Sequence, residues 1–493
     1  MKQLISITLL LTISFSFGQE KKDVQKMPNI IFVLADDLGW GDLGCYGNKD
    51  LKTPQIDKLA SQGTLFTQFY MNAAWCAPSR TAIMTGRFPS YNQFDFHNRA
   101  PERRADGRPG RYLDPENPNI TQILKTKGYT TGHYGKWHLG ADVNVPSPGE
   151  YGIDEFCVRN SSSTPNYKQR YLDGEFNNLF SDFNREFVAH STEIIVDDAI
   201  DFIERNKDKP FYLNLWTFLP HAMLNPTNEQ TNPYKKHMPP VATVNPGIKG
   251  ALAIYYGSVT ALDKQLGRLF DKIEEMGIAD NTMIIFTSDN GPEDIHNFSA
   301  THSGVGSTGP FRGNKRSAYE GGVRMPLLVK WKGNVEAGRV DTHSVIAGTD
   351  LLPTFCDIIG IETKNDWKLD GESVSDMILA GGEARDRTTN IKWRHDIVRE
   401  LYHQGEYHKS PSLAIREGGW KLLINPNGSE AELYNILTDP MEMRNMVNEK
   451  LEIAKTMKDE LLKWNSKLPY NERFENYRKV KHKWQWPKEK RGE

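Results

Sequence analysis

Cysteine is scarce in this chain of 493 residues, which contains only four, at positions 45, 76, 157 and 356. So few cysteines exclude a disulfide scaffold as the main source of stability. No Cys-x-x-Cys pair occurs, which argues against a zinc ion held by thiolates. A chain of this length can instead bury a large hydrophobic core.

An excess of charge of one sign is also missing. The 61 Lys and Arg residues and 63 Asp and Glu residues leave a formal net charge of −2, which argues against nucleic acid as the main partner. No transmembrane segment is predicted, since the apolar run Leu4 to Phe17 is short for a bilayer span. A lysine precedes this run and Gly18 follows it, as in a secretory signal peptide. We therefore predict a signal peptide over residues 1–18 and a secreted or periplasmic protein.

Apolar runs alternate with amphipathic stretches from residue 28 onward. The continuous run Ile30 to Ala35 is typical of a strand buried on both faces of a parallel sheet. The pattern predicts an α/β fold, in which helices sandwich a large, mostly parallel or mixed sheet. Further strands are expected at 211–218, 283–287 and 326–331, and helices at 53–63, 120–127, 193–206 and 249–276.

The pattern changes near residue 380. Short strands are expected at 412–416, 420–424 and 432–436, followed by one helix at 449–464. We predict a catalytic domain over residues 28–380 and a smaller C-terminal α+β subdomain over 381–480, with a short antiparallel sheet and a helix. Residues 481–493 form a lysine-rich tail, which is expected to be a solvated charged segment.

The stretch from Trp75 to Arg87 is expected to form a short helix with reactive groups at its start. Pro78 suits a first helical turn and Gly86 suits a helix end. Cys76 would lie at the helix N-terminus, where the dipole attracts anions and acidifies a thiol. Arg80, four residues later, shares its face of the helix. Together these groups predict a site for a tetrahedral oxyanion.

Carboxylates follow two of the expected strands. Asp36 and Asp37 end the first strand, and Asp289 and Asn290 follow a later one. Ligands of open α/β sheets bind at the carboxyl ends of the strands, so these side chains are expected to meet. A single Asp after a strand is more often a turn former. Two clusters of oxygen ligands on one edge favour a Ca²⁺ or Mg²⁺ site.

Four further polar residues stand at candidate strand ends or in a loop. Lys136 and His138 alternate, so in extended backbone they would present a cation and an acid or base on the same side. His221 follows the strand at 211–218, although a lone loop histidine is usually a surface residue. Lys315 lies in a Gly-rich loop, where it is either solvated or a further cation for the anion site.

These residues resemble the landmarks of the type I sulfatases, a family of the alkaline phosphatase superfamily. The run from Cys76 to Arg87 resembles the family's Cys-x-Pro-Ser-Arg-x-x-x-x-Thr-Gly signature. The other landmarks also occur in order: Asp36-Asp37, Gly135-Lys136-Trp137-His138, Pro220-His221, Ser288-Asp289-Asn290-Gly291, and Lys315 with Glu320-Gly321-Gly322. The resemblance implies an alkaline-phosphatase-like fold and a sulfuric ester hydrolase.

The resemblance also implies a modified nucleophile. In this family a dedicated maturation enzyme oxidises the signature cysteine, here Cys76, to formylglycine, whose hydrated aldehyde attacks sulfur. One Ca²⁺ would be held by residue 76 and by four oxygen ligands. These ligands would be Asp36, Asp37, Asp289 and Asn290.

Roles for the remaining landmarks follow by analogy with the family. Arg80, Lys136 and Lys315 would neutralise the sulfate. Asp289 would help to deprotonate the attacking hydroxyl. His221, together with Lys315, would protonate the leaving oxygen, and His138 would accept the proton of the second hydroxyl.

The substrate is expected to be a sulfated poly- or oligosaccharide, with algal glycans such as ulvan, carrageenan or fucoidan among the candidates. The positive charge of two loops is evidence for a polyanionic sugar chain as the substrate. The residues proposed to contact it are Arg103, Arg104, Lys235 and His237. Solvated charged loops explain these residues equally well.

Two alternatives remain open at this stage. Phosphonate or phosphate monoester hydrolases of the same superfamily bind a similar tetrahedral anion, although a simple phosphatase normally has Ser or Thr at the position of Cys76. A non-catalytic glycan-binding relative is the other alternative. The acid and base groups Lys136, His138, His221 and Lys315 argue against it, since a binding protein has no need of them.

Overall fold

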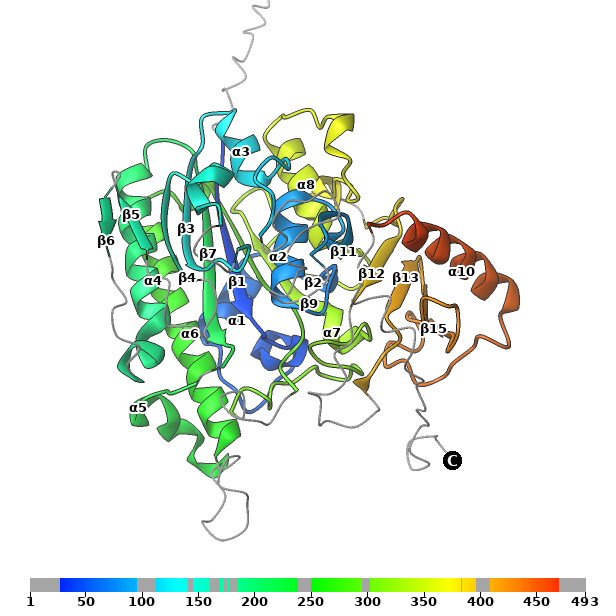
Figure 1. Ribbon diagram of the computed structural model, residues 1–493. Helices are drawn as coiled ribbons and strands as arrows, with labels where there is room; N and C mark the ends of the chain where they lie inside the picture. The colour runs from blue at the N-terminus through cyan, green and yellow to red at the C-terminus, as the bar shows by residue number, and fades with distance from the viewer. Residues whose placement is uncertain are drawn as a thin grey trace, which may run out of the picture.

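The computed structural model describes residues 27–94, 112–140, 145–159, 169–172, 175–177, 185–222, 224–237, 250–294, 302–382, 384–395 and 408–469. A large sheet with helices on both faces forms most of this part, and a small second sheet packs beside it (Figure 1). The expected signal peptide and the lysine-rich tail lie outside the described residues. No helix within these ranges is long and apolar enough to span a membrane.

The large sheet has the spatial order β10-β2-β9-β8-β1-β7-β3-β4-β5-β6, and β11 also pairs with β2. Strands β8, β1, β7 and β3 are parallel neighbours at its centre. Their strand-end residues therefore reach one edge of the sheet, as the sequence predicted. The strands are β1 Asn29–Asp36, β2 Thr64–Tyr70, β3 Thr130–Lys136, β4 Glu155–Arg159, β5 Gln169–Leu172, β6 Glu175–Asn177, β7 Phe211–Pro220, β8 Thr282–Ser288, β9 Arg324–Lys330, β10 Arg339–Asp341 and β11 Ile346–Ala347.

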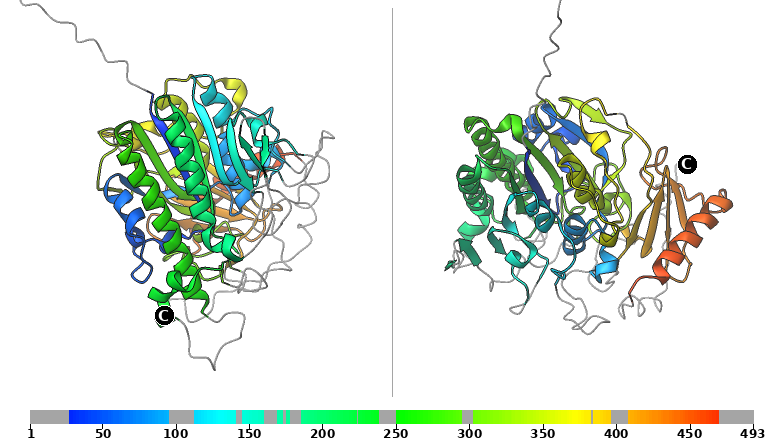
Figure 2. Two further views of the ribbon diagram at one scale, coloured as in Figure 1. Left: turned by 90° about the vertical axis from the view of Figure 1, so that its left-hand side faces the viewer. Right: turned by 90° about the horizontal axis from the view of Figure 1, so that it is seen from above.

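Helices cover both faces of the large sheet, so the central strands are buried on both sides (Figure 2). Helices α1, α4 and α6 pack on one face, and α2, α3, α8 and α9 on the other. This arrangement confirms the three-layer α/β architecture. The helices are α1 Pro54–Ser61, α2 Cys76–Thr85, α3 Ile120–Lys125, α4 Arg185–Asn206, α5 Asn228–Thr231, α6 Ala251–Glu275, α7 Glu320–Val323, α8 Leu351–Ile358 and α9 Ser375–Ile378.

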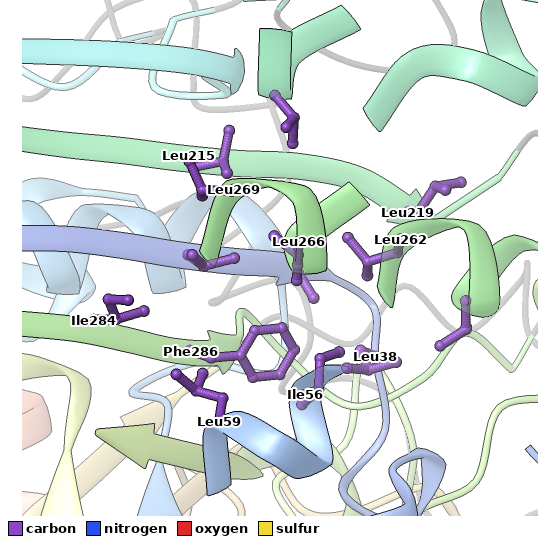
Figure 3. Packing of buried hydrophobic residues seen from close by; sticks show 14 of the residues in the cluster. Leu38, Ile56, Leu59, Leu215, Leu219, Leu262, Leu266, Leu269, Ile284 and Phe286 are labelled. Carbon is purple, nitrogen blue, oxygen red and sulfur yellow. The ribbon is translucent and has the colours of Figure 1, made fainter. Parts of the chain in front are cut away.

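Helix α6 shows how the sequence pattern determines the packing. Its leucines recur at helical spacing, and Leu262, Leu266 and Leu269 face the sheet, with Leu269 beside Leu215 of β7 (Figure 3). Ile284 and Phe286 of β8 meet them in the same cluster, which continues through α1. This apolar layer supports the strands that carry polar residues at their carboxyl ends.

The second sheet consists of β12 Ile391–Arg394, β13 Leu413–Glu417, β14 Trp420–Ile424 and β15 Glu432–Asn435. Its strands are all antiparallel, and helix α10, Leu451–Ser466, covers one face (Figure 1). The other face packs on the large sheet through Tyr70, Tyr319 and Trp393. The three expected strands and the helix are present, with β12 added from the stretch that looked irregular in sequence.

Some differences from the expected elements have physical causes. Strand β9 is antiparallel to both β8 and β2, so the sheet is mixed, which the prediction allowed. Helix α4 begins at Arg185, eight residues before the predicted start at Glu193. Strand β2 was not predicted, because Thr64 to Tyr70 contains both polar and apolar residues on a strand that is nevertheless almost wholly buried.

Candidate active site

Helix α2 carries Cys76 as its first residue, at the edge where the central strands end. Trp75 before it is extended, and Gly86 after it has a left-handed φ of 65°, as the helix-end prediction required. Every residue of α2 is buried. Its threonines fit this environment because Thr81 and Thr85 donate hydrogen bonds to carbonyls four residues earlier.

Carboxylates from two strands converge on Cys76. Ligand atoms of Asp36, Asp37, Asp289 and Cys76 all lie within 4.8 Å of one another. Asp37 has a left-handed φ of 65°, and its N–H donates to Asp289 Oδ1 at 3.1 Å. Three buried carboxylates this close require positive charge between or around them.

Asn290 adds an amide to this cluster. Its Nδ2 donates to Asp37 Oδ1 at 2.7 Å, which leaves Oδ1 of Asn290 buried without a hydrogen-bond partner. A buried acceptor with no donor is costly unless a cation takes the place of the donor. The donor set of carboxylates and one amide oxygen therefore fits a hard divalent cation such as Ca²⁺.

Each carboxylate has its own cationic side chain. Arg80 donates to Asp289 Oδ2 through Nε at 3.0 Å and Nη2 at 2.7 Å. Lys136 Nζ lies 2.6 Å from Asp36 Oδ2, and Lys315 Nζ lies 2.6 Å from Asp37 Oδ2. All six side chains are almost fully buried. The cations stand around one point, where an oxyanion beside residue 76 would meet all three.

The position of Arg80 is supported from behind. Its Nη1 donates to the carbonyl of Lys136 at 2.8 Å, and its guanidinium lies 5.1 Å from the ring centre of Trp216. His133 Nε2 lies 3.2 Å from the same carbonyl, between the rings of Trp137 and Trp216. A carbonyl, a carboxylate and an aromatic face together stabilise the buried guanidinium.

Burial and local charge reverse one expectation about Cys76. The helix N-terminus was expected to acidify the thiol, but burial and the nearby Asp289 raise its pKa well above the usual value. That expectation was wrong because the helix dipole acts here in a dry site that already holds three carboxylates. As an unmodified thiol, Cys76 is therefore a poor nucleophile.

The pKa of each other ionisable group in the site depends on its burial and on the charges beside it. Burial would raise the pKa of Asp37, but Lys315 and His221 hold it well below its usual range. Burial and Asp36 raise the pKa of Asp289 to about 6. Burial and the nearby Lys136 and Lys315 lower the pKa of His221 to about 3.

The two candidate histidines occupy different positions. His221 directly follows β7, and its Nε2 lies 3.7 Å from Asp37 Oδ2. His138 is buried two residues after β3 ends and has a left-handed φ of 60°. The extended backbone assumed for Lys136 to His138 is thus wrong, because the chain turns at the end of β3. The expected alternation of the two side chains does not apply here.

Of the expected substrate-contacting residues, Lys235 and His237 are not part of the buried cluster. Arg103 and Arg104 lie outside the described residues. Lys235 is exposed on the short helix η5, Asn232–His237, which packs on α6. His237 Nε2 lies 3.9 Å from Asp50 Oδ1, and its ring lies 5.4 Å from that of Tyr256.

Two residues around Lys315 were missed in the sequence. Glu293 Oε2 lies 3.7 Å from Lys315 Nζ, and its other oxygen accepts a hydrogen bond from Arg316. Glu293 follows the Asp289-Asn290-Gly291 landmark closely, and Arg316 is adjacent to Lys315. Nearness to landmarks was the available signal, but the pairing itself depends on how two loops fold together.

Comparisons with known proteins agree with this geometry. A family model described as Sulfatase matches residues 28–361, more than half of the chain. The chain belongs to the sulfatase family. It is a sulfuric ester hydrolase by family, and its large sheet has the alkaline-phosphatase-like fold of that family. A second model, described as N-sulphoglucosamine sulphohydrolase, C-terminal, matches residues 308–467 and thus includes the small sheet.

Three relatives of this sulfatase illustrate the similarity. Human N-acetylgalactosamine-6-sulfatase is 33% identical over 383 residues, covering 74% of this chain and 68% of the relative. A sulfatase of Formosa agariphila is 27% identical, and the match covers 94% of this chain and 93% of that relative. The structure of Ps i-CgsB in complex with k-i-k-neocarrahexaose has a TM-score of 0.73 and 26% identity, covering 92% of this chain and 97% of that one.

Proposed function

We propose that this sulfatase hydrolyses sulfate esters of a sulfated glycan, with residue 76 as the nucleophile after oxidation of Cys76 to formylglycine. The observation that carries the proposal is the ring of three cations around the start of α2. Arg80, Lys136 and Lys315 reach one buried point beside residue 76 from three separate elements. Such preorganised positive charge stabilises a sulfate whose charge grows during transfer.

A divalent cation, which we propose to be Ca²⁺, fits the same point. Asp36, Asp37, Asp289 and Asn290 would hold it, together with residue 76. A bound cation of this kind acts as a Lewis acid toward a sulfate oxygen. Within the chain, Arg80 and Lys136 would orient the sulfate.

Proton transfer is assigned to the remaining landmarks. Asp289 would help to deprotonate the attacking hydroxyl. Lys315 and His221, on the Asp37 side of the cluster, would face the leaving oxygen and supply its proton. His138 would accept a proton from residue 76 when sulfate is released.

Glycan as the substrate class is supported by the relatives. One relative is named for N-acetylgalactosamine, and one structural neighbour was solved with a neocarrahexaose. The expected signal peptide places such an enzyme outside the cytoplasm, where sulfated polysaccharides are met. We propose export through residues 1–18 and glycan contacts from the loops that carry Arg103, Arg104, Lys235 and His237.

Two measurements test the proposal. Mass spectrometry of the tryptic peptide spanning Cys76, from a host with the maturation enzyme, should show the aldehyde or its hydrate in place of the thiol. Sulfate release from a panel of sulfated oligosaccharides should then depend on the modified fraction. Full activity with unmodified cysteine would refute the assignment of oxidised residue 76 as the nucleophile. Turnover of phosphonate esters alone would refute sulfate esters as the substrate class.

A further inference from the structure

Lys315 lies between two carboxylates. Its Nζ is 2.6 Å from Asp37 Oδ2 on one side and 3.7 Å from Glu293 Oε2 on the other, and the side chain is 3% exposed. Its backbone N–H donates to the carbonyl of Pro292, at 2.9 Å, directly before Glu293. The lysine and Glu293 are therefore joined through both backbone and side chain.

Glu293 is itself held from behind by Arg316. The guanidinium contacts Glu293 Oε1 through Nη2, and the same nitrogen lies 3.2 Å from Asp294 Oδ1. Arg316 has a left-handed φ of 74°, a conformation that a non-glycine residue keeps only when its surroundings impose it. One such restraint is the hydrogen bond from its N–H to the carbonyl of Ala74, at 2.8 Å.

These contacts return to the start of α2. The Arg316 guanidinium lies 5.2 Å from the ring centre of Trp75, which immediately precedes Cys76. Cys76 Sγ in turn lies 3.6 Å from Asp37 Oδ1, on the carboxylate that holds Lys315. The result is a closed ring of contacts that fixes Lys315 relative to residue 76. It runs through Cys76, Asp37, Lys315, Glu293, Arg316 and Trp75.

From this ring we infer that Glu293 is a positioning residue that holds Lys315 toward the leaving oxygen of the sulfate ester. The inference rests on the proposed function, in which Lys315 helps to protonate that oxygen. Asp37 cannot hold the lysine alone, because it also serves as a proposed ligand of the divalent cation. A carboxylate shared with a cation attracts a neighbouring ammonium less strongly, so Glu293 supplies the second anionic partner.

The competing explanation is that Glu293 only neutralises Arg316 and stabilises the loop. Asp294 offers a matched control, because it is on the same loop and its Oδ1 lies 3.2 Å from the same arginine, whereas Glu293 also lies 3.7 Å from Lys315 Nζ. The substitutions E293Q and D294N each remove one charge while keeping the side-chain shape. A purely structural role predicts similar behaviour of the two variants.

The kinetic test uses the matured full-length enzyme and a series of aryl sulfates whose phenols differ in pKa, from 4-nitrophenyl to phenyl sulfate. Proton donation matters more as the leaving group becomes more basic. General acid catalysis contributes about 10²–10⁴-fold. We expect E293Q to lose about tenfold more kcat on phenyl sulfate than on 4-nitrophenyl sulfate, while D294N keeps the wild-type dependence.

A structural readout makes the test independent of turnover. Crystal structures of the wild type and both variants should show Lys315 Nζ displaced from its place beside Asp37 in E293Q and unmoved in D294N. An unmoved lysine in E293Q, or an equal kcat loss on every leaving group, would overturn the inference. If the wild type releases no sulfate from any aryl or sugar ester, the proposed function fails instead, and the lysine positions still decide the role of Glu293.

Discussion

Two clusters of buried charges lie in this molecule, and they are built differently. In the candidate active site, carboxylates from β1 and the end of β8 converge on one point beside Cys76. In the other cluster, between the two sheets, Glu320 and Glu442 share Lys421, with distances of 2.8 and 3.1 Å. Both clusters are inaccessible to solvent, and each contains an oxygen without a hydrogen-bond donor, Asn290 Oδ1 in the first and Glu442 Oε1 in the second. Of these two oxygens, Glu442 Oε1 has the ammonium group of Lys421 as its ion-pair partner, at 3.1 Å.

In the cluster between the sheets, the hydrogen bonds and ion pairs connect different strands to one another. Glu320 accepts from the hydroxyl of Tyr70 on β2 and from Arg324 on β9, while Lys421 reaches it from β14. The N–H of Glu320 donates to Glu442 at 2.7 Å. The carboxylates of the candidate active site therefore converge on one point that can bind a ligand, whereas those of the second cluster join different elements where the two sheets meet.

The largest expected effect comes from a substitution in the candidate active site. Cys76→Ala removes the precursor of the nucleophile but leaves a small residue at the start of α2. We expect kcat on a sulfated substrate to fall by about 10³-fold or more, with a thermal midpoint within about 3 °C of the wild type. Steady-state kinetics and calorimetry check this. Activity above a tenth of the wild-type level would contradict it.

The next effect belongs to the cluster between the sheets. Lys421→Met leaves Glu320 and Glu442 buried without their shared cation, which should lower the free energy of unfolding by about 3–5 kcal/mol. Denaturant unfolding measures the change. The control is Lys455→Met, because Lys455 pairs with Asp459 where both side chains are exposed, at 71% and 63%. Its free energy of unfolding should stay close to that of the wild type. Equal losses in the two variants would contradict the assignment.

The two clusters should also differ in whether they are needed for stabilisation by a divalent cation. Ca²⁺ at about 100 times its dissociation constant should stabilise the wild type by about 2.7 kcal/mol. Asp36→Asn should abolish this gain, while Glu320→Gln, although destabilised, should retain it. Thermal unfolding after chelation, with and without added Ca²⁺, measures all three. A Ca²⁺ response lost in Glu320→Gln, or kept in Asp36→Asn, would show that the clusters are not distinct in this way.

The smallest effect, measured over one pH unit, concerns the support behind Arg80. Burial lowers the pKa of His133 from 6.5 to about 3, so the folded state keeps this ring neutral. Its contribution to stability is therefore full above pH 6.5 and is lost as the pH falls toward 3. Below pH 6.5 the wild type should lose up to about 1.4 kcal/mol per pH unit more than His133→Gln. Denaturant unfolding at several pH values checks the difference, and parallel curves would contradict it.

Much of the sheet was predictable from sequence, because its central strands follow a simple rule. Strands buried on both faces read as continuous apolar runs, as Ile30 to Ala35 does. The polar residues at the ends of β8, β1, β7 and β3 could then be expected at one edge, and these strands are neighbours. Strand β12 was missed because its lysine and arginine conceal the alternation of a half-buried strand.

The parts of the site that could not be predicted depend on tertiary packing. The left-handed turn at His138 has only a weak signal in its residue type, since histidine is enriched at positive φ but still adopts it rarely. The contacts of Glu293 with Lys315 and Arg316 join loop residues that no helical or strand periodicity places together. The raised pKa of Cys76 likewise depends on burial beside Asp289, which a helix-end argument alone does not include.

The complete burial of α2 determines when Cys76 could be modified, before folding or after it. Cys76 is 2% exposed, and the strand whose end closes the site beside it, β8, begins only at Thr282. An enzyme that oxidised this side chain, as proposed, would not reach it in the finished fold. Under that proposal, maturation and folding would compete for the same cysteine, and maturation would have to occur before β8 closes the site.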